Sequence, residues 1–233
     1  MHADGAVHRE GEVGAAEVSA PKKAGAARPA RSPGARTASG ATTRGATRFI
    51  AFLRAINVGG HTVTMERLRA LFAEMGFRGV ETFIASGNVV FEAAAMDVTA
   101  LERTIGARLE KALGYEVVTF VRTPAELAAI AEYEAFGAAD VARGKAHCVG
   151  FLAEPLGKAA AAKLMALRTG VDDFRVHGRE IHWLSRVWQS ESAFSNAAFE
   201  KAVGVRATFR GVNTVRKMAA KYASPGRGGD GAR

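Results

Sequence analysis

The sequence predicts an α+β protein made of two successive β-α-β-β-α-β units, followed by one further helix. Short apolar runs typical of buried strands alternate with segments whose apolar residues recur every three or four positions, as in amphipathic helices. Four of these segments end at a glycine followed by an apolar residue, which is a common helix end: 75–77, 113–115, 169–171 and 203–205. The same order of elements occurs twice.

The first unit, residues 48–122, is predicted to hold four strands and two helices. The strands are expected at 49–53, 80–85, 89–91 and 116–121, and the helices at 65–75 and 98–112. Thr64 and Asp97 precede the helices as residues that can accept a first-turn N–H hydrogen bond. Ser86-Gly87-Asn88, between the middle strands, is typical of a tight turn, although it also offers a hydroxyl and an amide.

Residues 123–144 are predicted to link the units. Thr123-Pro124-Ala125-Glu126 combines a cap, a proline at the first helical position and a glutamate at the third, and predicts a helix to about Tyr133, followed by a loop.

The second unit and its extra helix are expected within residues 145–223. Its strands are predicted at 147–153, 171–176, 179–184 and 205–209, and its helices at 156–167, 192–203 and 214–222. Asn213 is the expected cap of the last helix. The repeated order predicts two tandem ferredoxin-like domains, each an antiparallel sheet with helices on one face, plus an appended C-terminal helix.

Both ends of the chain have a different composition. Residues 1–47 contain no Leu, Ile or Phe, and residues 224–233 are rich in Gly and Arg. Because such segments bury too little apolar area to offset the entropy lost on ordering, we expect two disordered tails.

Composition also limits the class of protein. No apolar run approaches the roughly 20 residues of a membrane span, and the first residues form no secretory signal. The only cysteine, Cys148, excludes an internal disulfide, so a cytoplasmic protein is expected. The net charge is +9, of which +5 falls on residues 48–223, so an anionic partner is favoured.

Three motifs carry a family resemblance. FIAFLRAINVGG at 49–60, TFIASGNVVF at 82–91 and GVRATFRGVNTVRKMA at 204–219 resemble the bacterial domain-of-unknown-function family 1697, over about residues 48–222. The resemblance implies a tandem ferredoxin-like fold and no particular activity. Five positions depart from the family pattern, and an altered ligand would be one consequence: Ala55, Ala85, Glu191, Ala193 and Val212.

The loop after the first strand is one candidate site. Arg54, Asn57, Gly59 and Gly60 lie between a strand and a helix N-terminus, where a guanidinium and backbone N–H groups can bind an anion. The loop contains neither a Walker nor a dinucleotide-binding glycine pattern. A purely structural connection, with Arg54 paired to a nearby acid, is the alternative.

The C-terminal region is the second candidate site. Residues 201–223 contain no acid, and Arg210, Arg216, Lys217 and Lys221 could follow a nucleic-acid backbone. A solvated basic helix is the alternative.

Other reactive side chains form no recognised pattern. His147, Cys148, His177 and His182 match no zinc-ligand spacing, so no metal and no cofactor are expected. No nucleophile–base pair is identifiable, so the sequence does not decide whether the protein is an enzyme. The sequence favours a binding module for an anionic ligand, either a nucleotide or nucleic acid. The alternative is an enzyme that acts on a small anionic substrate at the loop Arg54–Gly60. The oligomeric state is not predicted.

Overall fold

The computed structural model describes residues 46–57, 60–85 and 87–223, which belong to one compact unit that spans Thr43–Arg233. The two predicted tails therefore fall almost entirely outside the described residues. Ala46 and Thr47, assigned to the N-terminal tail by composition, are instead part of the first strand. No described helix is long and apolar enough to cross a membrane.

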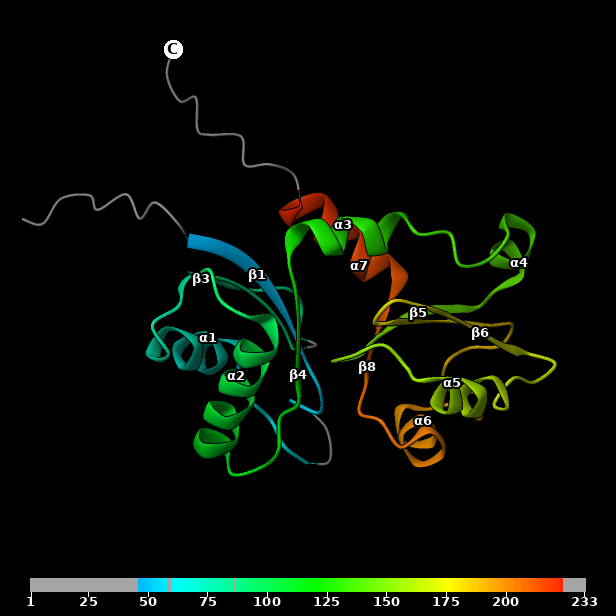
Figure 1. The fold of residues 1–233 in the computed structure, drawn as a ribbon, viewed down its shortest axis with the longest axis horizontal. Helices are drawn as coiled ribbons and strands as arrows, with labels where there is room; N and C mark the ends of the chain where they lie inside the picture. Colours follow the sequence, from blue (N-terminus) through cyan, green and yellow to red (C-terminus); the bar gives the residue numbers. More distant parts are fainter. Residues whose placement is uncertain (1–45, 58–59, 86, 224–233) are drawn as a thin grey trace, which may run out of the picture. The chain divides into compact units, whose positions relative to one another are not determined.

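The described residues form an α+β fold with two four-stranded antiparallel sheets and seven helices (Figure 1). The first half contains β1(Ala46–Leu53), α1(Met65–Glu74), β2(Arg78–Thr82), β3(Asn88–Ala94), α2(Val98–Leu113) and β4(Thr119–Arg122). Two helices follow, α3(Pro124–Glu132) and α4(Ala138–Arg143). The second half contains β5(Ala146–Phe151), α5(Lys158–Met165), β6(Asp172–His177), β7(Glu180–Ser185), α6(Asn196–Val203), β8(Thr208–Gly211) and α7(Val212–Tyr222).

The two sheets repeat one topology. Their strand orders are β2-β3-β1-β4 and β6-β7-β5-β8, so β1 and β5 are central while β4 and β8 are edge strands. Each helix pair, α1 with α2 and α5 with α6, packs on one face of its own sheet around a separate core. The predicted element order of both halves is confirmed.

A third core joins the halves. It combines residues from β1, β3 and β4 with residues from α3, β5 and α7, and we call it the joint core. At its centre the rings of Phe52 and Phe151 stack with centroids 3.8 Å apart. Helices α3 and α7 lie side by side over this core (Figure 1). The last helix is therefore a structural part of the unit rather than an appendage.

The local signals for helix starts are confirmed. Thr64 accepts from the Arg67 N–H at 3.1 Å, and Asp97 accepts from the Ala100 N–H at 2.8 Å. Thr123 begins α3 with a complete capping box. Each such bond satisfies an N–H that has no partner within the helix.

Several boundaries differ from the prediction. Helix α7 begins directly after β8 with Gly211 as its cap, so Asn213 lies inside the helix and does not cap it. The segment predicted as a loop after Tyr133 contains α4. Gly114 and Gly204 cap the ends of their helices in the left-handed conformation, whereas α5 ends at Met165 with Ala166 as its C-cap, ahead of the glycine in the 169–171 pattern. Tertiary contacts decide such endpoints where local propensity is weak.

Candidate functional site

Two buried arginines occupy equivalent positions in the repeated fold. Arg122 in β4 pairs with Ile50 in the β1–β4 ladder, and Arg210 in β8 pairs with Val149 in the β5–β8 ladder. Both side chains lie on the sheet face toward the joint core. They therefore mark the same place in the two halves.

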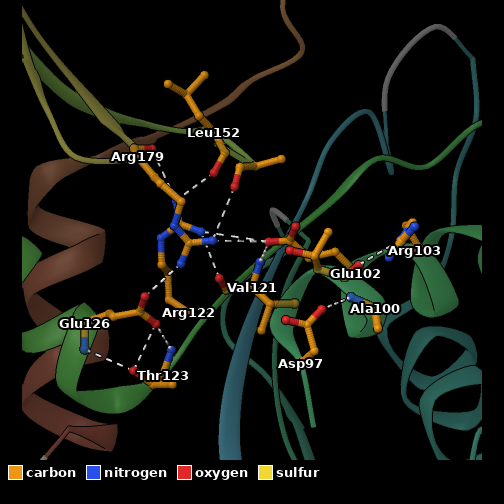
Figure 2. A network of polar contacts seen from close by, with 12 residues as sticks. Asp97, Ala100, Glu102, Arg103, Val121, Arg122, Thr123, Glu126, Leu152 and Arg179 are labelled. Atoms are coloured by element: carbon orange, nitrogen blue, oxygen red, sulfur yellow. Dashed lines mark hydrogen bonds and ion pairs between the residues drawn. The ribbon is translucent and has the colours of Figure 1, made fainter. Parts of the chain in front are cut away.

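Each arginine reaches into the other half of the unit. The Nη2 of Arg122 donates to the Leu152 carbonyl at 2.8 Å, just beyond the end of β5 (Figure 2). The Nη2 of Arg210 donates to the Leu53 carbonyl at 2.8 Å, at the end of β1. Each half thus extends one arginine side chain into the other half. Each guanidinium donates to a carbonyl at or just beyond the end of that other half's central strand.

The two arginines differ in the charge of the side chain that accepts from their Nε. The Nε of Arg122 donates to the Glu180 carboxylate at 2.7 Å, and the Nε of Arg210 donates to the Asn88 amide oxygen at 2.7 Å. Glu180 begins β7 and Asn88 begins β3, so these residues are also equivalent. A carboxylate therefore pairs with one arginine and a neutral amide with the other.

On the Arg122 side, carboxylates of the protein itself lie beside the buried cation. Besides Glu180, a second carboxylate from Glu102 of α2 lies 3.9 Å away. Burial lowers the pKa of Arg122, while the charge of Glu180 opposes that shift. Arg179 bonds Glu126 at 2.7 Å beside the α3 cap, which extends the network (Figure 2). Because both signs of charge are present and hydrogen-bonded, this network needs no external partner.

The Arg210 side has no such carboxylate among the described residues. Arg210 is 9% exposed, and no carboxylate of the described residues lies within 4.0 Å of its guanidinium. Its remaining bonds go to the Thr208 hydroxyl at 2.7 Å and the Phe209 carbonyl at 2.9 Å. Burial lowers the pKa of Arg210 to about 10. A buried cation without a counterion is unfavourable, and an anion beside it would relieve that cost.

Arg210 lines a cavity of about 580 Å³ between the two halves. The walls come from the end of β1 and the following loop, from β7 and β8, and from the start of α6. Trp183, Phe194 and Phe209 supply aromatic surface, while Ser195 and Asn196 supply polar atoms. The described lining residues include no Asp, Glu, His, Cys or Lys. Its charged groups are thus Arg210 and one other arginine, Arg54.

Arg54 lines the cavity, but its charge is already paired. Its Nε and Nη2 donate to the two oxygens of Glu200 in α6, at 2.5 and 2.6 Å. Burial acts to raise the Glu200 pKa, but bonds from Arg54, the Ala207 N–H and Arg206 outweigh it and lower that pKa. Arg54 is thus in an internal ion pair, as in the structural alternative, and it also borders the cavity.

The other loop candidates play different parts. Asn57 lines the cavity, and its Oδ1 accepts from the Val63 N–H at 2.7 Å, which closes the loop onto itself. Gly60 does not line the cavity. It has φ +87°, a left-handed backbone conformation that glycine adopts readily. Gly59 lies outside the described residues. The structure therefore brings Arg54 and Asn57 to the cavity and leaves Gly60 away from it.

Ala55, one of the departures from the family pattern, adopts φ +60°. A side chain costs about 1 kcal/mol in this left-handed conformation, which glycine adopts freely. We therefore expect Ala55→Gly to raise the free energy of unfolding by about 1 kcal/mol, measured by urea denaturation. The control is Ala162→Gly at an exposed position within α5, which should lower it by about 1 kcal/mol. A loss of stability in Ala55→Gly would contradict the strain argument.

The proposed nucleic-acid residues do not form one surface. Arg210 is buried, whereas Arg216, Lys217 and Lys221 are exposed. Arg216 donates to the Ala131 carbonyl at 3.4 Å, and Lys221 lies 2.9 Å from the Glu81 carboxylate. Only the exposed three could track a phosphate backbone, and Lys221 is shared with an acid.

The histidines and the cysteine take no part in the cavity. His147 and His182 lie under the α3–α4 connection, where His182 contacts the ring of Tyr133. Burial, with the charges of His147 and His177, lowers the pKa of His182 to about 4. Burial raises the pKa of Cys148 to about 11. Within the described ranges no group of three or more His, Cys, Asp or Glu is arranged to hold a metal ion.

Sequence reasoning missed the paired roles of Arg122 and Arg210 and the part of Asn88. One signal was present, since each half carries an arginine at the end of its last strand, just before a helix. The α6 residues of the cavity wall gave no signal, because Ser195 and Asn196 look like ordinary helix-start residues.

Comparison with known proteins agrees with this architecture. The family model described as "Protein of unknown function (DUF1697)" matches residues 46–182, more than half of the chain. That range ends before the C-terminal motif at 204–219. A solved structure, that of the conserved bacterial protein SP0830 from Streptococcus pneumoniae, aligns with a TM-score of 0.58 and 21% identity, over 76% of this chain and 98% of that one. None of the curated proteins compared with the sequence matches it.

Proposed function

Since the chain belongs to the DUF1697 family, which is described as a protein of unknown function, we propose a function from the cavity itself: this protein binds a small organic anion there. The anionic group lies against the Arg210 guanidinium, and the rest of the ligand lies along the aromatic wall. Arg54 and Asn57 border the same space.

The observation that carries the proposal is the unequal treatment of the two equivalent arginines. The protein supplies a carboxylate for Arg122 and a neutral amide for Arg210. Arg210 lines a cavity large enough for a metabolite. An anion from solution would supply there the charge that Glu180 supplies in the other half.

The composition of the wall supports binding over catalysis. Among the described lining residues there is no carboxylate, histidine, cysteine or lysine that could act as general acid or base. Ser195 is the N-cap of α6 and bonds the Ala198 N–H at 3.1 Å. The position of Arg210 also favours a small ligand over nucleic acid, because the cavity is bounded on several sides while Arg216 and Lys217 are elsewhere.

We also infer that each half is a ferredoxin-like unit. The β-α-β-β-α-β order, the strand order with the first strand central and the helices on one face support this inference.

The test replaces Asn88 with its isosteric acid. In Asn88→Asp an internal carboxylate accepts from Arg210, so a ligand anion no longer supplies the missing charge. Affinity for organic anions should fall by about tenfold or more, measured by calorimetric titration with a panel of carboxylates and phosphate esters. A second variant, Ala197→Trp, fills the cavity from the exposed start of α6 and should abolish binding without touching Arg210.

Lys217→Ala is the matched control, because it removes an exposed cation outside the cavity. It should leave the affinity unchanged. Failure of the unaltered protein to bind any member of the panel would overturn the proposal, as would equal affinities in the unaltered protein and both cavity variants.

A further inference from the structure

The hydrogen-bonding capacity left on Arg210 indicates which anion the cavity accepts. A guanidinium has five N–H donors in a fixed plane. Nε donates to Asn88, the two Nη1 donors go to the Thr208 hydroxyl and the Phe209 carbonyl, and one Nη2 donor goes to the Leu53 carbonyl. One N–H therefore has no acceptor among the described residues. A two-pronged contact to a phosphate would require breaking an existing bond.

The charge of the site also restricts which anion it can bind. The Arg54 charge is matched by Glu200, and Arg206 lies 3.1 Å from Glu116 as well as 3.2 Å from Glu200. These four residues balance one another, so Arg210 contributes a single uncompensated positive charge. A singly charged anion neutralises it, while a dianion would leave one negative charge desolvated against an apolar wall.

The other lining residues indicate the rest of the ligand. Trp183, Phe194 and Phe209 form apolar aromatic surface. Asn196 donates through Nδ2 to Glu200 at 3.2 Å, which fixes its amide, and its buried Oδ1 has no donor among the described residues. A buried acceptor without a donor is costly, and a ligand hydroxyl or N–H would satisfy it.

We propose that the ligand is a monocarboxylate with an apolar or aromatic body and one neutral hydrogen-bond donor, and not a phosphate ester or a nucleotide. One carboxylate oxygen accepts the remaining N–H of Arg210, and the donor group bonds the Asn196 Oδ1. This inference rests on the proposed function and specifies the chemical class that the same cavity selects.

The experiment compares compounds that share a carbon skeleton. Several alkyl, aryl and hydroxylated skeletons are each titrated as the carboxylate and as the phosphate monoester, for example 3-phenylpropionate, 3-phenyllactate and 2-phenylethyl phosphate. Carboxylates should bind more tightly than their phosphate partners by about tenfold or more. The hydroxylated 3-phenyllactate should bind more tightly than 3-phenylpropionate, and Asn196→Ala should bring the ratio of the two affinities close to one.

The outcomes separate this inference from the proposed function. Tighter binding of the phosphate esters, abolished by Ala197→Trp, would overturn the monocarboxylate class and retain the anion site. A hydroxyl advantage that persists in Asn196→Ala would overturn the assigned donor contact. If no compound of either class binds, both the inference and the proposed function fail.

Discussion

Arg122→Met is expected to lower the free energy of unfolding by about 3–5 kcal/mol, because it removes one partner of a buried ion pair. Glu180 is 7% exposed and would lose the guanidinium that now lies 2.7 Å away. The carbonyls of Val121 and Leu152 would also lose their donor. Urea denaturation monitored by circular dichroism measures the change.

Two controls make the Arg122 result specific. Arg48→Met breaks an ion pair with Glu92 whose side chains are 41% and 37% exposed, and it should change stability by less than about 1 kcal/mol. Adding Glu180→Gln to Arg122→Met replaces the acid that has lost its partner by a neutral amide. The double variant should regain part of the lost free energy of unfolding. Equal effects of Arg122→Met and Arg48→Met would show that the buried pair does not hold the halves together.

The second large effect concerns α7. A chain that ends at Gly211 is expected to lose its cooperative unfolding transition, because the helix buries Val212, Val215, Met218 and Tyr222 in the joint core. Each large apolar side chain contributes about 1.5–3 kcal/mol when buried, so together they rival the 5–15 kcal/mol that stabilises a typical domain. Loss of the helix would also uncover parts of β5 and β8, which it contacts.

Point variants in α7 test the same claim within a folded chain. Met218→Ala, at a fully buried position, should cost about 2–5 kcal/mol. Lys217→Ala, at the neighbouring exposed position, should stay within about 0.5 kcal/mol. A truncated chain that still unfolds in a single sharp transition would mean that the sheets do not need α7.

The sequence by itself determined the parts of the fold that depend on near neighbours. Thr64, Asp97 and Thr123 each bond an N–H three residues ahead, so the helix starts could be read from short motifs. The apolar periods likewise separated strands from helices. These signals are local because helix caps and side-chain alternation are properties of a few consecutive residues.

The tertiary structure alone decided the candidate site. In the sequence, Arg54 looked like a residue that binds an anion together with the nearby glycines. Its charge is instead paired with Glu200, 146 residues away. Arg210 looked like a surface cation, yet it is buried against Leu53, 157 residues away, and it carries the unbalanced charge. Which arginine receives a carboxylate depends on how the two halves pack. Contacts between residues so far apart leave no periodic pattern in the sequence, because burial and charge balance arise only when the strands that carry them meet.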